Sequence, residues 1–309
     1  MAQKTKWQGI YPAVTTKFTQ DDKLDIAEME RCYALQVDAG IHGLITCGSL
    51  GEASTLDPDE KIEVLKTAIR VAKGRLPVLQ TVSSGSTRQA QAAGEAAAKA
   101  GAQGLMVLPG LPYKSEPHET IAHFRAVAKA SGLPVMIYNN PVAYGVDITP
   151  SMLAELAEDP LMVAVKESSD DIRRVTKIIN LLGDRMQIFT GVDNLALESL
   201  AMGAVGWVAG LVCAFPEETV AVYELHRPGR MDEALAIYRW FQPLLDLDVS
   251  ARLVQNIKLV EAIAINTSDR CRAPRMALMG AERARIEKIV RDAMAKRPKL
   301  AAPKRAKSA

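Results

Sequence analysis

The stretch Leu161-Met162-Val163-Ala164-Val165-Lys166 is an apolar, partly β-branched run that ends at a lysine. Such runs are typical of strands that are covered on both faces, as in parallel sheets. Comparable runs recur along most of the chain. The expected strands are Ile10–Thr15, Gly43–Gly48, Pro77–Ser83, Gly104–Pro109, Pro134–Asn139, Met162–Lys166, Gln187–Gly191 and Gly206–Leu211.

Segments with a helical period lie between these runs, for example Asp25–Ala39, Asp57–Ala72, Thr87–Ala100 and His118–Ala130. Capping residues precede several of them, as at Asp57 before Pro58. Strands that alternate with helices in this number predict an α/β fold, the closed (β/α)8 or TIM barrel. A doubly wound sheet is disfavoured because no GxGxxG turn follows the first run.

The strand pattern stops at about Arg230. Residues 231–246, 249–265 and 276–297 have a helical pattern and predict a C-terminal appendix of about three helices. No Gly/Ser/Pro-rich linker separates this appendix from the barrel. The predicted organisation is a barrel over residues 1–229, helices packed on it over 230–297, and a disordered basic tail over 298–309.

Composition limits the classes of partner. The chain has 309 residues and a formal net charge of +2, which predicts no nucleic-acid or anionic-membrane surface. No apolar run approaches the length of about 18 residues that a membrane span needs, and the N-terminus lacks the apolar segment of a secretory signal. The 4 cysteines form no CxxC pair, which is typical of a reducing cytosol. We expect a cytoplasmic protein.

Active-site groups of such barrels lie at the carboxyl ends of the strands. Lys166 closes the sixth run, so its amine is expected in a partly desolvated cavity. Burial lowers the pKa of a lysine and yields the free amine that attacks a carbonyl carbon. Position alone equally allows an ion pair with Glu167 or Glu52. Lys258 also has apolar neighbours, but a snorkelling stem in a helix explains it.

Two further strand ends carry candidate residues. Tyr138, before Asn139, Asn140 and Pro141, is a phenol suited to proton transfer, or else a solvated rim tyrosine. The loop Gly48-Ser49-Leu50-Gly51-Glu52 offers successive backbone amides suited to a carboxylate, or else forms an ordinary turn. Ser49 is placed to hydrogen-bond Tyr138. No histidine ends a strand, so we expect no metal site.

Three motifs occur in an order and at a spacing typical of one known family. They are the loop Gly-Ser-Leu-Gly-Glu, the motif Tyr-Asn-Asn-Pro and the lysine of Val-Lys-Glu-Ser-Ser. In these motifs the chain resembles the dihydrodipicolinate synthase / N-acetylneuraminate lyase family of Schiff-base lyases, over almost its whole length. The resemblance implies a homotetramer built as a dimer of dimers, a small-molecule substrate, and neither cofactor nor metal. It also implies that Lys166 forms the imine, that Tyr138 and Ser49 move protons, and that Ser49, Leu50, Gly191 and Val208 contact the substrate.

The motifs depart from those of the synthases at positions that bear on substrate. Leu50 replaces a threonine, and Ala143 replaces the arginine that grips a second carboxylate. The family's second tyrosine is missing near Pro109–Tyr113, where Tyr113 is a candidate substitute from a shifted position. With these departures, the motifs resemble those of the 1-pyrroline-4-hydroxy-2-carboxylate deaminases of hydroxyproline degradation. Those enzymes form 2-oxoglutarate semialdehyde and ammonia.

Other functions remain open at this point. One is 4-hydroxy-tetrahydrodipicolinate synthase, and another is a 2-keto-3-deoxy sugar acid aldolase or dehydratase. A barrel that binds 2-oxo acids without catalysis is the alternative from another class, although binding alone needs no nucleophile.

Overall fold

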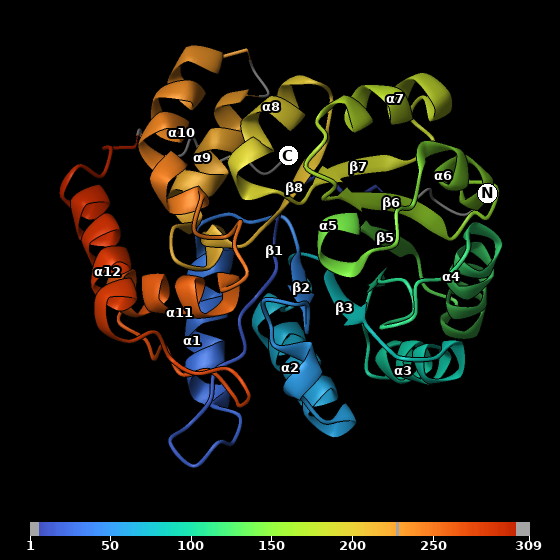
Figure 1. Cartoon of the computed structure of the whole chain (residues 1–309), viewed down its shortest axis with the longest axis horizontal. Coiled ribbons are helices and arrows are strands. Elements are labelled where there is room, and N and C mark those ends of the chain that lie inside the picture. The colour runs from blue at the N-terminus through green and yellow to red at the C-terminus, as the bar shows by residue number, and fades with distance from the viewer. Residues whose placement is uncertain (1–5, 227–228, 301–309) are drawn as a thin grey trace.

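The computed structural model describes residues 6–226 and 229–300, and it forms a parallel β-barrel surrounded by helices (Figure 1). The 8 strands follow the order β1-β8-β7-β6-β5-β4-β3-β2, and neighbouring strands in this order are parallel. The strands are β1 (Gly9–Pro12), β2 (Leu44–Thr46), β3 (Val78–Val82), β4 (Gly104–Val107), β5 (Val135–Asn139), β6 (Met162–Glu167), β7 (Gln187–Thr190) and β8 (Gly206–Ala209). The predicted (β/α)8 barrel is confirmed.

Helices cover the outside of the barrel and complete the alternation with the strands (Figure 1). Those within the barrel region are α1 (Ile26–Asp38), α2 (Pro58–Ala72), α3 (Thr87–Lys99), α4 (Pro117–Ser131), α5 (Pro141–Tyr144), α6 (Pro150–Leu156), α7 (Arg173–Leu182), α8 (Ala196–Ala201) and α9 (Pro216–His226). Short 3-10 helices occur at η1 (Ala53–Thr55), η2 (Asp193–Leu195) and η3 (Leu211–Cys213).

Local sequence explains where these helices begin and end. Asp57 and Glu60 form a reciprocal capping box at the start of α2. Ser86 accepts a hydrogen bond from the amide of Gln89 at the start of α3. Gly101, with a φ of 97°, follows α3 in a conformation that side chains disfavour, and so turns the chain toward β4.

The barrel closes between β1 and β2. The closure consists of a parallel bridge between Ala13 and Ile45 and a hydrogen bond of 2.8 Å from the amide of His42 to the carbonyl oxygen of Ile10. Beyond the bridge, the hydroxyl of Thr16 donates to the carbonyl oxygen of Gly51 at 2.7 Å. The loops after β1 and β2 are therefore held together at the carboxyl end of the barrel.

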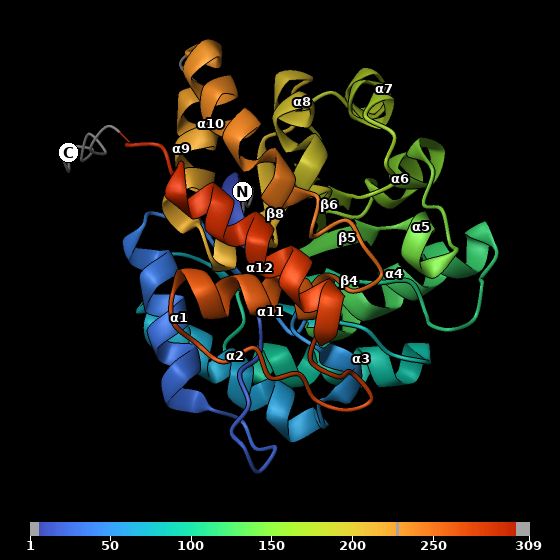
Figure 2. The same ribbon diagram turned by 60° about the vertical axis from the view of Figure 1, so that its left-hand side comes forward.

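Three helices follow the barrel region, as predicted: α10 (Met231–Leu245), α11 (Leu253–Ala264) and α12 (Gly280–Ala295). Figure 2 shows α11 and α12 lying across the barrel. Lys17 and Glu261 join α11 to the loop after β1 through an ion pair of 2.7 Å, in which both side chains are almost fully buried. The hydroxyl of Thr15 also donates to both carboxylate oxygens of Glu261 at 3.0 Å.

The structure shows that the snorkelling predicted for Lys258 is wrong. Its side chain is fully buried rather than snorkelling, and its ammonium forms an ion pair with the buried carboxylate of Glu52. The ammonium also donates to the carbonyl oxygen of Arg270 at 2.6 Å, and the amide of Arg272 donates to Glu52 at 3.0 Å. Helix α11 is thus attached to the loops after both β1 and β2 by buried charges.

Among residues 6–226 and 229–300, no helix combines the length and the apolar character needed to cross a membrane. The predicted disordered tail falls mostly on residues 301–309, which lie outside the described part of the chain.

Candidate functional site

Lys166 and Tyr138 lie on adjacent strands and face one another. The register of β5 and β6 pairs their Cα atoms, and the ammonium nitrogen of Lys166 lies 4.1 Å from the centre of the Tyr138 ring. Both side chains are buried, with exposed fractions of 7% and 6%. Both residues thus lie at the carboxyl ends of their strands, where active-site groups of such barrels are expected.

Gly191 makes room for the lysine. A Cβ atom at this position would lie 2.5 Å from Cε of Lys166 and 2.1 Å from the Ser168 hydroxyl oxygen. Any side chain at residue 191 would therefore displace Lys166. This close approach places Gly191, a predicted substrate contact, directly beside the candidate nucleophile.

Burial sets the electrostatics of this pair. Desolvation lowers the pKa of Lys166 below the usual lysine value, while Asp248, Tyr144 and Asp193 act in the opposite direction. Burial also raises the pKa of Tyr138 above that of a free phenol. At neutral pH the site thus favours the amine form of Lys166 more than water does, and it keeps the phenol protonated.

The alternative in which Lys166 pairs with Glu167 or Glu52 is not realised. Glu52 is engaged by Lys258, as described above. Glu167 accepts hydrogen bonds from the side-chain amide of Asn139 at 3.0 Å and from the backbone amide of Ser169 at 2.8 Å. Both carboxylates brace loops of the barrel mouth.

Ser49 contacts a different tyrosine from the expected one. Its hydroxyl forms a short hydrogen bond with the phenol of Tyr144, at the end of α5. The phenol oxygen of Tyr138 instead accepts a hydrogen bond of 3.2 Å from the Asn140 side chain. The rings of Tyr138 and Tyr144 meet edge to face with centres 5.8 Å apart. The expected Ser49–Tyr138 hydrogen bond is therefore replaced by an arrangement in which Tyr144 lies between the two.

Tyr113 is not a substitute for the missing second tyrosine within this chain. Its side chain is 60% exposed, and its hydroxyl donates to Glu119 at 3.0 Å. Tyr144 instead supplies a second phenol beside Tyr138, and burial raises its pKa to about 12. The sequence analysis missed Tyr144, which lies three residues after the Tyr-Asn-Asn-Pro motif, because only the turn of α5 brings its side chain to Ser49.

The loop after β2 has the features of a carboxylate site. Cys47 and Glu52 adopt left-handed backbone conformations, with φ of 55° and 57°. Leu50 is buried, and Ser49 is partly exposed. Within the described ranges, the backbone amides of Ser49 and Leu50 donate no hydrogen bond to protein. These amides are therefore available to an anion. Val208, the remaining predicted contact, is buried in β8.

Two carboxylic acids complete the barrel mouth. Asp193 is fully buried and accepts hydrogen bonds from the indole of Trp207 at 2.8 Å and from the amide of Leu211 at 2.9 Å. The amide of Gly210 also donates to Asp193, at 3.1 Å. Asp248, from the segment between α10 and α11, lies against the other side of Gly210, where a Cβ atom would stand 2.3 Å from its carboxylate oxygen. Burial raises the pKa of both acids.

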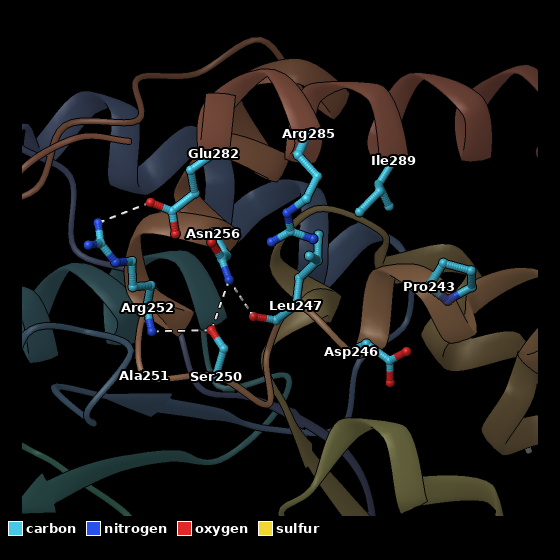
Figure 3. Close-up of a pocket in the computed structure, with 10 residues that line it drawn as sticks. All are labelled: Pro243, Asp246, Leu247, Ser250, Ala251, Arg252, Asn256, Glu282, Arg285 and Ile289. Atoms are coloured by element: carbon cyan, nitrogen blue, oxygen red, sulfur yellow. Dashed lines mark hydrogen bonds and ion pairs between the residues drawn. The ribbon is translucent and has the colours of Figure 1, made fainter. Parts of the chain in front are cut away.

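A separate pocket of ≈ 350 Å³ opens on the outer side of the segment between α10 and α11 (Figure 3). Its lining includes Asp246, Arg252, Asn256 and Arg285, and neither Lys166 nor Asp248 contributes to it. It is therefore distinct from the Lys166 site. Within the described residues, no group of at least 3 His, Cys, Asp or Glu side chains is arranged to hold a metal ion.

Comparisons with known proteins agree with this geometry. The dihydrodipicolinate synthetase family matches residues 6–293. A 4-hydroxy-tetrahydrodipicolinate synthase of Methanospirillum hungatei is 34% identical over 77% of this chain and 82% of its own length. One from Geotalea uraniireducens is 29% identical over 93% of this chain and 98% of its own length. A prophage protein of the same family from E. coli K12, solved in complex with pyruvate, shares 25% identity over 94% and 99% of the two chains with a TM-score of 0.88.

Fold and site define the class of protein, a (β/α)8-barrel enzyme with a buried lysine at the end of β6. The chain belongs to the dihydrodipicolinate synthetase family and is a Schiff-base lyase of that family. Family membership confirms the predicted enzyme class and a small-molecule substrate, and it removes the alternative of a non-catalytic barrel.

Proposed function

We propose that this enzyme forms an imine between Lys166 and C2 of 1-pyrroline-4-hydroxy-2-carboxylate, and converts it to 2-oxoglutarate semialdehyde and ammonia in hydroxyproline degradation. The observation that carries this proposal is the loop from Asn140 to Gly145. There a synthase would place an arginine, whereas this chain places the exposed Ala143 and turns the phenol of Tyr144 toward Ser49.

The proposed reaction uses the residues in a definite order. The amine of Lys166 adds to C2, and the ring C2–N bond breaks, leaving the opened substrate as an imine with a primary amine at C5. The imine withdraws electrons from C3 while the phenol of Tyr138 gives its proton to the C4 hydroxyl, which leaves as water, and takes up the proton from C3 in exchange. The product carries an imine at C5 after proton shifts. Water then hydrolyses both imines and releases ammonia and the product.

Charge at the mouth supports a substrate with one carboxylate. The amides of Ser49 and Leu50 are available to that carboxylate, while Asp193 and Asp248 stand near Lys166. A second substrate carboxylate there would meet acids rather than a cation, and it would lack the bidentate partner that arginine provides.

Two measurements test the proposal. The first is reduction with borohydride in the presence of pyruvate, which should give a mass adduct on Lys166 that is absent from Lys166→Ala. The second is ammonia release from 1-pyrroline-4-hydroxy-2-carboxylate, with pyruvate plus aspartate semialdehyde as the competing assay. Faster consumption of the second pair would contradict the deaminase and favour the synthase.

The synthase is the second candidate because relatives at 28–34% identity carry that name. A 2-keto-3-deoxy sugar acid would be a third substrate class for the same lysine chemistry. We also propose a homotetramer, on the family resemblance alone, and a cytoplasmic location, on the cysteine pattern. Sedimentation of the purified enzyme should give four times the 33.5 kDa mass of one chain.

A further inference from the structure

We infer that Asp248 is a specificity-determining residue, which binds the amino group of the substrate after Lys166 has opened its ring. This inference rests on the proposed function, because it concerns a substrate whose nitrogen lies at the far end from its carboxylate. Asp248 belongs to the C-terminal helical region rather than to the barrel.

The position of Asp248 is fixed by contacts at the carboxyl end of β8. Its carboxylate lies against Gly210, where an added Cβ atom would be 2.3 Å from Oδ1 and 2.9 Å from Cγ. Gly210 is held from its other side, since its amide donates to Asp193 at 3.1 Å. The Asp248 carboxylate therefore lies at the barrel mouth, in the space that a side chain at residue 210 would fill.

Asp248 lies close enough to Lys166 and Tyr138 to act on both electrostatically. Of the charged groups that act on the pKa of Lys166, Asp248 raises it most, ahead of Tyr144 and Asp193. Asp248 also raises the pKa of Tyr138. Burial and the neighbouring Asp193 raise the pKa of Asp248 well above that of an ordinary carboxyl group, and Lys166 lowers it.

Asp248 has no partner of its own in the described ranges: no hydrogen bond or ion pair to its carboxylate occurs there. Asp193, by contrast, is saturated by the indole of Trp207 and the amides of Gly210 and Leu211. The Asp248 side chain is partly exposed, and a cationic ligand would give its carboxylate the partner that the protein does not provide. Asp248 is accordingly the acid that is available to a ligand.

The chemistry of ring opening supplies such a cation. When the amine of Lys166 replaces the ring nitrogen at C2, its two protons pass to that nitrogen, which leaves as a primary amine on C5. The neutral carboxyl group of Asp248 can then transfer its proton to this amine, giving an ammonium and a carboxylate in contact. The proposed site of the substrate carboxylate is the loop after β2, and Lys166 lies on β6. The C5 end of the opened substrate can therefore extend toward β8.

The test compares two five-carbon compounds, of which only one contains a nitrogen atom. The compounds are 1-pyrroline-2-carboxylate, which opens to an imine carrying an amine, and 2-oxopentanoate, which has none. Neither carries the hydroxyl group that the proposed elimination requires. The readout is the second-order rate of borohydride-trapped adduct on Lys166, measured by mass spectrometry for the wild type, Asp248→Asn and Asp246→Asn. Asp246 is a matched control, because it is exposed in the same segment and bonds Asn194 instead.

The wild type should react faster with the pyrroline than with 2-oxopentanoate. Asp248→Asn should reduce this preference by roughly 10–100-fold, the range for a hydrogen bond to a charged group. Its rate with 2-oxopentanoate should change little by comparison, and Asp246→Asn should keep the wild-type preference. A structural defect would slow both compounds together, so the ratio separates recognition from folding.

An unchanged preference in Asp248→Asn, an absent preference in the wild type, or no adduct with either compound would overturn the inference. Ammonia release from the hydroxylated pyrroline is measured separately. If the wild type shows the Asp248-dependent preference but releases no ammonia, the proposed function fails while recognition of the amino group by Asp248 stands.

Discussion

Burial favours the amine form of Lys166, the form that attacks a carbonyl carbon, and two neighbouring residues determine where its side chain lies. Gly191 lets the strand-end lysine lie flat against β7, Tyr138 presents its ring face at 4.1 Å, and burial lowers the lysine pKa. A lysine on an exposed helix has none of these features.

The lowered pKa of Lys166 predicts the pH dependence of imine formation. Only the neutral amine attacks a carbonyl, so the rate should rise with pH and level off once the amine is fully deprotonated. Because the pKa is lowered, the midpoint of this rise should lie below the value of about 10.4 that is usual for lysine. Trapping with pyruvate across the pH range would measure the midpoint, and a midpoint at or above the usual value would contradict the burial argument.

Replacing Tyr138 with Phe should reduce kcat by about 10²–10⁴-fold, because the phenol transfers protons in the proposed reaction. Tyr144→Phe should also reduce kcat, since it removes the hydrogen bond with Ser49. Tyr113→Phe is the matched control, because that phenol is exposed and bonds Glu119. Steady-state rates of the three variants measure this, and equal losses in all three would rule out the assigned relay.

The sequence predicted Lys166 and Tyr138 because strand ends share one edge of a barrel. It predicted the wrong partner for Ser49, since α5 brings Tyr144 closer than strand register alone implies. Asp248 carried no sequence signal. It follows the last strand in a region whose pattern is purely helical, and only tertiary packing brings it to Gly210.

Helix α11 is attached to the barrel by buried charge rather than by an apolar face alone. Lys17 with Glu261 and Lys258 with Glu52 link it to the loops after β1 and β2. The helix was predictable from its period. The attachment of the helix was not predictable. A lysine among apolar residues has the same sequence pattern whether its ammonium reaches the solvent or forms a buried ion pair.

Lys17→Met should destabilise the fold by about 3–5 kcal/mol, because it leaves the carboxylate of Glu261 buried without its cation. Lys288→Met is the control, since the ion pair of Lys288 with Asp292 is exposed and such pairs contribute about 0–1 kcal/mol. Urea unfolding followed by circular dichroism measures both. Similar midpoints for the two variants would show that the buried pair is not needed for stability.

At the scale of the whole molecule, barrel and C-terminal helices depend on each other. A chain ending at Gly229 would retain Lys17 and Glu52 but lose Glu261 and Lys258, exposing apolar surface and leaving charges unpaired. We expect this truncated chain to lack cooperative thermal unfolding, whereas the full chain shows one transition. A sharp transition in the truncated protein would establish the barrel as an independent domain.

The closure between β1 and β2 has a consequence for biosynthesis. The two strands that meet there are made before the other strands of the barrel, but Lys258 and Glu261, which hold their loops, are made after all of those strands. Nascent chains tend to fold from the N-terminus as they emerge. The ring cannot be completed in that order alone, because β1 also pairs with β8, the last strand of the barrel, and the loops after β1 and β2 gain their buried ion pairs only once α11 has been made.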